Sequence, residues 1–326
     1  MIEWSGLHSA LDPFGPQAAR VHGLWRFLWI VSLAVYVLVI AALAWAALRR
    51  RTPAEADPTP RPAAEVAGPA LRTTIVGATV ATVLILFVFL VVDLATGRPL
   101  TAAPRGGRGA LEIEVTGHQW WWQVEYPSSR PDLRVVTANE IHVPTGRPVV
   151  VTLTSTDVIH SFWPPSLVGK RDMIPGEKTS VWFQADTPGV YRGQCAEFCG
   201  YQHAKMAFQI VAEPAEQFER WMARQRDSAR TPADSLALRG QEVFLATSCV
   251  MCHTVRGTPA GSRIGPDLTH LASRRTIAAG SLPNTRGALA GWIVDPQSIK
   301  PGTRMPSNQI EPDDLQALLA YLESLK

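Results

Sequence analysis

Four side chains that bind soft metal ions stand close together near residue 200. Cys195, Cys199, His203 and Met206 fall within twelve residues. Thiolates, thioethers and imidazoles favour copper over hard cations. Two thiolates can bridge two copper ions with one histidine on each, so a further histidine is needed. His160 is the best candidate because it follows a β-branched strand at a loop.

The same spacing permits two simpler interpretations. The four positions share one face of a helix, so they could form a half-buried stripe. Alternatively, Cys195 and Cys199 could form a disulfide in an exported domain. A stripe of this composition is chemically unusual and Gly200 weakens a helix, which favours the copper site.

A second pair of cysteines lies in Cys249-Val-Met-Cys252-His253, the C-x-x-C-H pattern of c-type haem attachment. Two thioether bonds fix the porphyrin, and the adjacent imidazole becomes the proximal iron ligand. The alternatives are a thiol-redox pair or half of a zinc site. No thioredoxin-like βαβ pattern surrounds the motif, and no other cysteine pair is free to complete a zinc site, so the sequence favours haem.

The second axial ligand must come from the opposite side of the haem. Met305 is the candidate, because Met251 is the only other methionine after residue 233 and lies inside the attachment loop. His270 is the alternative, which would give bis-histidine ligation. Ligation by histidine and methionine raises the reduction potential and suits an electron carrier.

Two long apolar segments precede these motifs. Phe27–Leu48 and Thr73–Val92 are 22 and 20 residues without a charge, and each is long enough to cross a bilayer as a helix. The loop 49–72 carries five arginines against two in the N-terminal arm and three in the sixteen residues after Val92. The positive-inside rule therefore places the loop in the cytoplasm and both termini outside.

The first apolar segment could instead be a signal peptide. It is too long for a typical signal and is followed by three arginines, so a membrane span is favoured. A net charge of +3 gives no indication of a nucleic-acid surface.

The rest of the chain divides into a β-rich part and a helical part. Strand-like segments separated by turn signals predict a small β-sandwich or barrel; they are Leu111–Thr116, Gln119–Tyr126, Val149–Thr154, Thr179–Gln184 and Ala207–Val211. Helices are predicted over Leu238–Ala246, Arg286–Val294 and Pro312–Leu325. The predicted organisation is an external arm (1–23), transmembrane helices (24–48 and 73–95) around a cytoplasmic loop (49–72), a linker (96–109), a β domain (110–213), a second linker (214–233) and a helical domain (234–326).

Three motifs together resemble subunit II of haem–copper oxidases, the subunit that holds the dinuclear CuA centre. They are Gly193-QCAEFCGYQHAKM, Val158-IHSFW and Gly117-HQWWWQVEY. The resemblance covers roughly residues 20–215 and implies an all-β cupredoxin fold. It implies six CuA ligands, with Glu197 acting through its backbone carbonyl: His160, Cys195, Glu197, Cys199, His203 and Met206. It further implies that the Glu197 side chain helps hold a magnesium ion shared with subunit I.

The aromatic run 120–122 has two expected roles. Strand alternation places Trp120 and Trp122 on one face and Trp121 on the other, and at least one of the three is expected in the core. The resemblance implies that Trp120 is the exposed residue through which an electron reaches CuA.

Residues from about 235 to the end resemble a class I cytochrome c of the all-α type. The loop Ile264–Leu268 follows the attachment motif where such cytochromes carry a loop that packs on the proximal histidine. Fusion to subunit II is the mark of caa3-type oxidases. The resemblance implies that electrons pass from haem c, held by Cys249, Cys252, His253 and Met305, to CuA and then to the oxygen-reducing centre of subunit I.

The implied partners are subunit I, subunit III and an external donor such as a cytochrome c or a bc1-type complex. The implied location is the bacterial inner membrane, with both cofactor domains on the periplasmic side. Two alternatives are the CuA subunit of a nitric oxide reductase and a membrane-tethered electron carrier. A copper-delivery protein would have no haem motif.

Overall fold

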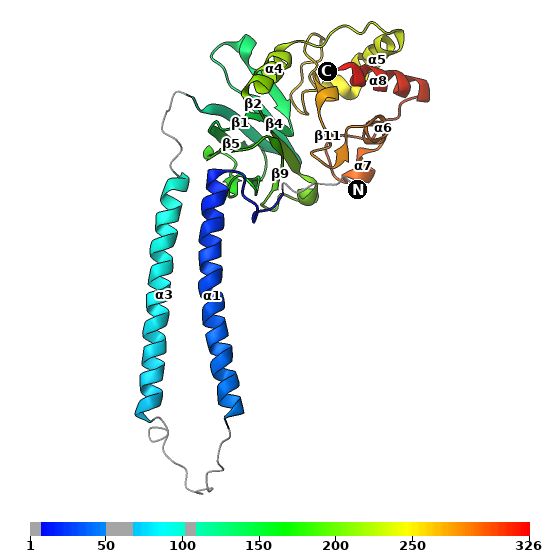
Figure 1. The fold of residues 1–326 in the computed structure, drawn as a ribbon. Coiled ribbons are helices and arrows are strands. Elements are labelled where there is room, and N and C mark those ends of the chain that lie inside the picture. The colour runs from blue at the N-terminus through cyan, green and yellow to red at the C-terminus, as the bar shows by residue number, and fades with distance from the viewer. Residues whose placement is uncertain (1–7, 50–67, 102–108) are drawn as a thin grey trace. The chain divides into compact units, whose positions relative to one another are not determined.

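The computed structural model of the protein describes residues 8–49, 68–101 and 109–326 (Figure 1). The chain forms two compact units. One consists of residues 20–102, and the other of residues up to 19 and from 103 onward. Residues 50–67 of the predicted cytoplasmic loop and 102–108 of the predicted linker lie outside the described residues, and residues 96–101 of that linker continue the second long helix.

Two long helices form the unit of residues 20–102. Helix α1 runs over Pro16–Leu48 and helix α3 over Pro69–Thr101. Both are long and apolar enough to cross a membrane, and their side chains are mostly exposed, as expected for surfaces that face lipid. Phe27 of α1 meets Phe89 of α3 edge to face, with ring centroids 5.6 Å apart.

The β domain is a sandwich of two five-stranded sheets, with orders β3-β2-β1-β5-β8 and β4-β10-β9-β6-β7. The strands are β1 (Leu111–His118), β2 (Trp121–Tyr126), β3 (Val135–Ala138), β4 (Glu140–Pro144), β5 (Val149–Ser155), β6 (His160–Trp163), β7 (Arg171–Met173), β8 (Thr179–Phe183), β9 (Gly189–Cys195) and β10 (Ala207–Glu213). A short 3-10 helix, η1, spans Pro131–Leu133. The predicted β-sandwich and all-β class are confirmed.

Alternation of inward and outward side chains builds the core between the sheets. Along β2, Trp122, Val124 and Tyr126 are buried while the residues between them are not. Trp122 lies edge-on to Phe208 of β10, with ring centroids 5.1 Å apart. The expectation that at least one residue of the tryptophan run lies in the core is confirmed by Trp122.

The N-terminal arm belongs to the same unit as the β domain. The backbone N–H of Phe14 donates to Ser166 O at 2.8 Å, and the Gln17 side chain donates to Trp182 O at 3.0 Å. A residue just before helix α1 and the first turn of that helix are therefore fixed to the sandwich.

The segment 214–233, predicted to be a linker, contains a helix that contributes to the β-domain core. Helix α4 covers Ala215–Arg226 and buries Phe218, Trp221 and Met222. Trp221 stacks on His142 at 4.1 Å. The apolar positions of this helix are spaced for one buried face, so only the residues after it connect the domains.

The C-terminal domain is built from helices around one apolar core. They are α5 (Ser235–Ala246), α6 (Arg286–Val294), α7 (Pro296–Ile299) and α8 (Pro312–Ser324), with 3-10 turns η3 (Ser248–Met251) and η4 (Leu271–Ser273) and a minimal hairpin, β11 (Thr276–Ile277) with β12 (Leu282–Pro283). Helices α5 and α8 cross closely, because Gly240 lies against the backbone of Ala317, where a side chain would collide. The predicted all-α class of this domain is confirmed.

Backbone contacts join the β domain to the helical domain. The N–H of Ala207 donates to Ala279 O at 3.0 Å, and the N–H of Arg275 donates to the Glu140 carboxylate at 2.6 Å. Gln202 donates to Pro301 O at 2.7 Å. These contacts hold the copper-motif loop and Glu140 against the segments around residues 275–279 and 301 of the helical domain.

Candidate copper site and haem pocket

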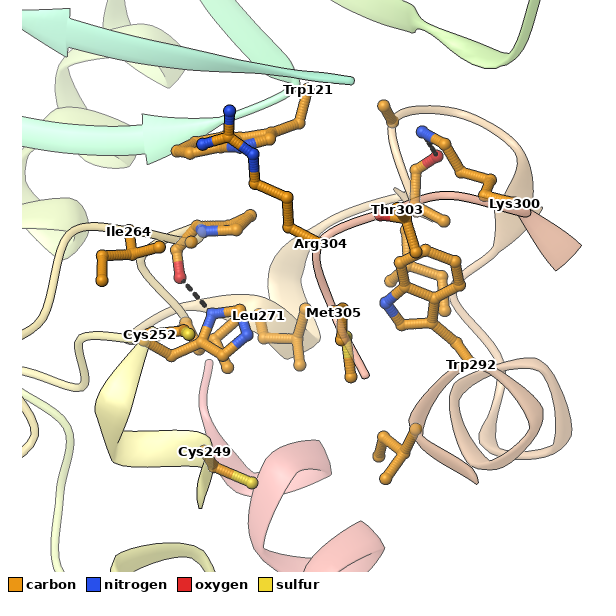
Figure 2. Close-up of a pocket in the computed structure, with 18 of the residues that line it drawn as sticks. Trp121, Cys249, Cys252, Ile264, Leu271, Trp292, Lys300, Thr303, Arg304 and Met305 are labelled. Atoms are coloured by element: carbon orange, nitrogen blue, oxygen red, sulfur yellow. Dashed lines mark hydrogen bonds between the residues drawn. The ribbon is translucent and has the colours of Figure 1, made fainter. Parts of the chain in front are cut away.

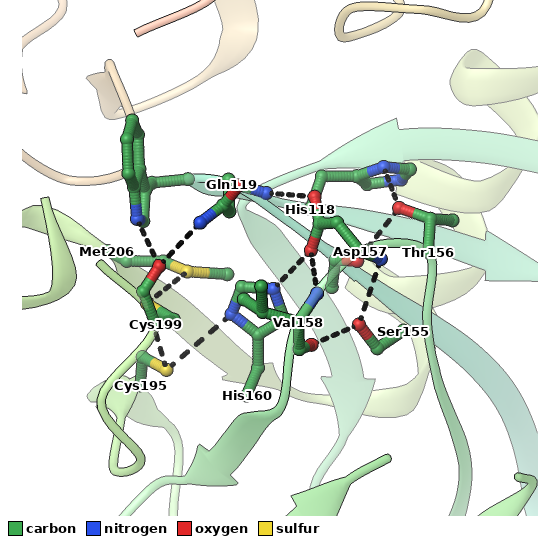
Figure 3. A network of polar contacts seen from close by, with 12 residues as sticks. His118, Gln119, Ser155, Thr156, Asp157, Val158, His160, Cys195, Cys199 and Met206 are labelled. Carbon is green, nitrogen blue, oxygen red and sulfur yellow. Dashed lines mark hydrogen bonds and ion pairs between the residues drawn. The ribbon is translucent and has the colours of Figure 1, made fainter. Parts of the chain in front are cut away.

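Four of the side chains predicted to bind copper lie close together in Figure 3: His160, Cys195, Cys199 and Met206. The Sγ atoms of Cys195 and Cys199 are 3.8 Å apart. His160 Nδ1 lies 3.8 Å from Cys195 Sγ, and His203 Nδ1 lies 3.7 Å from Cys199 Sγ. Met206 Sδ is 3.9 Å from Cys199 Sγ. Each cysteine thus has its own histidine.

Strand ends and a loop hold these donors. Cys195 ends β9 and His160 begins β6, and these strands are neighbours in one sheet. The loop then folds back, with the Cys195 N–H donating to Met206 O at 2.9 Å. The carbonyl oxygen of Glu197 lies 3.2 Å from Cys195 Sγ. The backbone at this residue therefore faces the sulfur pair.

Asp157 orients the histidine from β6. Its Oδ1 accepts a hydrogen bond from His160 Nε2 at 2.8 Å, and its two oxygens also accept from the backbone N–H groups of Gln119 and Val158 (Figure 3). A proton fixed on Nε2 leaves Nδ1, the atom nearest Cys195, free to bind a metal.

Gly117 of β1 makes room for the same imidazole. A Cβ at this position would lie 2.8 Å from His160 Cδ2. The absence of a side chain at Gly117 is therefore required by the packing of His160.

A cation between the two sulfur atoms would stabilise both thiolates. The Cys199 thiol beside it, and the hydrogen bond with His160, hold the pKa of the Cys195 thiol far below its ordinary value. Contact with Cys195, together with burial, raises the pKa of the Cys199 thiol. Two thiolates in one buried site repel each other unless a cation lies between them. Two thiolates, two imidazoles and a thioether fit copper ions.

A largely apolar cavity surrounds the second cysteine motif (Figure 2). Cys249, Cys252, His253 and Met305 all line it. The apolar part of its wall comes from η4, β11 and the helices α6 and α8: Leu271, Ile277, Leu289, Trp292, Ile293 and Leu322. A cavity with two thiols, an imidazole and a thioether among apolar side chains fits a covalently attached haem.

The loop Ile264–Leu268 holds the histidine of the motif, as predicted. His253 Nδ1 donates to Pro266 O at 2.7 Å, which leaves Nε2 unprotonated and available to iron. Burial lowers the pKa of His253 and so favours the neutral imidazole. Gly265 lies so close that a Cβ there would be 2.8 Å from His253 Cε1.

The two candidates for the second axial ligand have different surroundings. Met305 lines the cavity on the segment that follows α7 (Figure 2). His270 is buried outside this cavity, and its ring nitrogens lie 2.9 Å from Lys326 O and 3.1 Å from Asp227 O. The described structure therefore favours Met305 over His270.

Trp120 is not exposed, which corrects the expectation from the sequence. Its side chain is only 7% exposed, because the segment around Gly302 of the helical domain covers it. The indole Nε1 donates to Cys199 O at 2.9 Å, and the ring also lines the apolar cavity. Trp120 thus contacts both the copper-loop backbone and the cavity.

Two residues of this region were not singled out from the sequence. Asp157 stands three residues before His160, and Lys300 stands five before Met305. The closeness of Asp157 to His160 in the sequence could have indicated its role. The contacts of Lys300 could not be predicted in this way, because they depend on how the two domains meet.

The fold and the two sites define a membrane-anchored electron-transfer subunit of two cofactor domains, and known proteins match it. The profile of the cytochrome c oxidase subunit II periplasmic domain matches residues 128–213, and that of cytochrome c matches residues 237–326. Cytochrome c oxidase subunit 2 of Alkalihalophilus pseudofirmus is 36% identical over 325 residues, which is 98% of this chain and 91% of that protein.

Two further proteins are similar to this chain. Subunit 2 of Bacillus sp. strain PS3 is 34% identical over 231 residues, covering 67% of this chain and 63% of that one. The solved periplasmic domain of subunit II of cytochrome oxidase from Bradyrhizobium japonicum is 31% identical, covering 37% of this chain and 96% of that one with a TM-score of 0.34. The chain belongs to the cytochrome c oxidase subunit II family, with a cytochrome c domain fused at its C-terminal end.

Proposed function

We propose that this chain is the electron-accepting subunit of a caa3-type cytochrome c oxidase. The observation that carries the proposal is Trp120, which contacts the copper loop through its indole and lines the predicted haem cavity with its ring. When bound, the cofactors supply one-electron transfer, from an outside donor to haem c, on to CuA, and then to the oxygen-reducing centre of subunit I.

The β domain provides the donors and the shielding for copper. Cys195, Cys199, His160, His203 and Met206, together with the Glu197 carbonyl, would hold the copper ions. Asp157 keeps His160 in the tautomer that binds through Nδ1. Burial of both sulfurs excludes water from the site.

The helical domain provides the ligands for haem. Cys249 and Cys252 would hold the haem through thioether bonds, and His253 and Met305 would bind its iron. The Pro266 carbonyl fixes the proximal imidazole, and the apolar wall keeps water from the iron.

The Glu197 side chain is the residue expected to hold magnesium at the boundary with subunit I. Its carboxylate is 42% exposed and lies 3.3 Å from Lys170 Nζ. A carboxylate that lies within the copper loop and is reachable from solvent supports this role.

The two cofactor domains lie on the periplasmic side of the bacterial inner membrane. The N-terminal arm hydrogen-bonds to the sandwich, which supports placing the arm and the β domain on the same side of the membrane. The arginine-rich loop between the spans supports the cytoplasm as the other side. Subunit I, and with it subunit III, covers the apolar surfaces of α1 and α3, and the donor is a cytochrome c or a bc1-type complex.

Rapid mixing of the assembled oxidase with a reduced cytochrome c tests this proposal. We expect the haem of the full chain to be reduced first and the copper next, followed by oxygen consumption. Cys199→Ser should leave haem reduction intact and abolish oxygen consumption, whereas Ser180→Ala at an exposed position should behave as the wild type. Oxygen consumption at the wild-type rate in Cys199→Ser would overturn the proposal.

A further inference from the structure

A lysine is buried where the two cofactor domains meet. Lys300 follows α7 and is only 2% exposed. Its Nζ donates to Trp120 O at 2.8 Å and to Ala278 O at 3.3 Å. Lys300 also lines the apolar cavity (Figure 2).

The ammonium group of Lys300 has no anionic partner within the described part of the chain. Both of its hydrogen-bond partners are backbone carbonyls. The charged or titratable groups that act on it from neighbouring elements are Lys205 of the 3-10 helix η2 (His203–Lys205), which repels it, and the Cys199 thiol. A buried charge held only by carbonyls is costly, and an apolar side chain of the same length would fill this space without that cost.

The hydrogen bonds of Lys300 link it to the copper loop. Lys300 bonds the carbonyl of Trp120, whose indole bonds the carbonyl of Cys199. One side chain of the helical domain is thereby connected to the copper loop through a single residue. Nearby, Gln202 donates to Pro301 O at 2.7 Å, and Lys205 donates to Ile299 O. The segment 299–301 is thus held on the copper domain by hydrogen bonds that it donates and by hydrogen bonds that it accepts.

We propose that Lys300 is a positioning residue that fixes the helical domain on Trp120 and places a buried positive charge between the two cofactor sites. The charge stabilises an added electron on the haem side of the contact and so raises the reduction potential there. The hydrogen bond to Trp120 O holds the two sites at a fixed separation, on which the rate of electron transfer between them depends. This inference rests on the proposed function.

The charge is expected to respond to pH. Burial, with the repulsion from Lys205, lowers the pKa of Lys300 to about 7. Lys300 is therefore protonated and charged below this pH, and it gives up its proton to solvent as the pH rises through this value. The haem potential of the wild type should fall over the same pH range.

Three variants of the full chain separate charge from position: Lys300→Met, Lys300→Gln and Lys300→Arg, with the exposed Lys178→Met as the matched control. The first measurement is a spectroelectrochemical titration of the haem from pH 6 to pH 9. Lys300→Met and Lys300→Gln should lower the potential and remove its pH dependence. Lys300→Arg should keep the high potential at every pH, and Lys178→Met should match the wild type.

The second measurement is amide hydrogen exchange at residues 119–122 and 299–303, which needs no turnover. Lys300→Met should speed this exchange and slow haem-to-copper electron transfer by about tenfold or more, because small displacements at such a contact are costly. Wild-type potential and exchange in Lys300→Met would overturn the proposal. Equal lowering of the potential by Met and Arg would refute the role of the charge. Absence of any haem-to-copper transfer in the wild type would instead refute the proposed function.

Discussion

The two cofactor sites of this chain are built in different ways. The copper donors come from one loop and one adjacent strand, and their sulfur and nitrogen atoms already lie within 4 Å of a neighbouring donor. The residues proposed to bind haem come from the attachment turn at 249–253 and from the distant Met305, and they line an apolar cavity. The residues of the copper site are held by a packed domain core, whereas we expect the packing of the helical domain to depend on an attached haem.

This difference predicts how each domain depends on its cofactor. Packing of the β-sandwich does not need the metal, because Trp122, Phe162 and Phe208 fill the interior beneath the site. In the helical domain, Leu271 and Trp292 line the apolar cavity, and an attached haem would add contacts to both side chains. Four changes test the contrast, beginning with the largest expected effect.

Removing haem attachment should unfold one domain and spare the other. The double variant Cys249→Ala/Cys252→Ala leaves the apolar cavity empty, so we expect the helical domain to lose about 5 kcal/mol, most of the stability of a typical domain. Hydrogen exchange compared between residues 235–326 and 111–213 measures this. Slow exchange in the helical domain of the haem-free variant would contradict the contrast, while copper-free protein serves as the reciprocal control.

Breaking the sulfur pair should remove metal without unfolding. Cys199→Ser removes a buried sulfur atom that lies next to both His203 and Met206. The chain should therefore lose at least one copper ion and the near-infrared absorption of a mixed-valence pair. Covalent haem and the melting temperature of the helical domain should not change. Two copper ions per chain in this variant would show that Cys199 does not bridge.

Two glycines offer a matched pair for the comparison. A Cβ at Gly117 would lie 2.8 Å from His160, and one at Gly265 would lie 2.8 Å from His253. We expect each Gly→Ala change to cost about 1–3 kcal/mol through overpacking. Gly117→Ala should alter only the copper spectrum and Gly265→Ala only the haem spectrum. Gly169→Ala, where nothing lies within 4 Å, is the control, and equal spectral changes at both centres in either variant would contradict the separation.

The smallest expected effect is a pH dependence confined to the β domain. Burial opposes a charge on His142, but its contacts with Glu140 and Glu213 outweigh burial and raise its pKa. A raised pKa in the folded state stabilises the fold below about pH 6.5, the ordinary value, and this stability is lost as the pH rises through the folded value. His142→Gln should remove the dependence, at less than about 2 kcal/mol.

Thermal melts of the two domains followed between pH 5 and pH 9 measure this effect. Because His142 stacks on Trp221 of α4, the loss should appear with the undocking of that helix. The same slope in His142→Gln as in the wild type would assign the dependence to another group.

The copper site and the fold class were largely predictable from the sequence because their signals are local. Cys195, Cys199, His203 and Met206 lie within one loop, and His160 follows a strand with clear β-branched character. The cytochrome motif and the leucine stripe of α8 are local in the same sense. Strands as short as β7, with three residues, show no alternation by which a sequence could reveal them.

What was not predictable depends on contacts between the domains. The position of Trp120 in a predicted strand gave no sign that residues near Gly302 would cover it. The buried amino group of Lys300 and the docking of α4 have the same origin, since each depends on a surface formed by distant segments. The roles of the individual site residues remain predictions that the variants above test.

The most direct test of this account is a count of metals in the purified full chain, combined with its spectra. We predict two copper ions and one covalently bound haem per chain, with a mixed-valence near-infrared band that disappears in Cys199→Ser while the haem spectrum stays unchanged. A single copper ion with a mononuclear blue-copper spectrum, or a disulfide between Cys195 and Cys199 in the protein isolated with copper, would contradict the account.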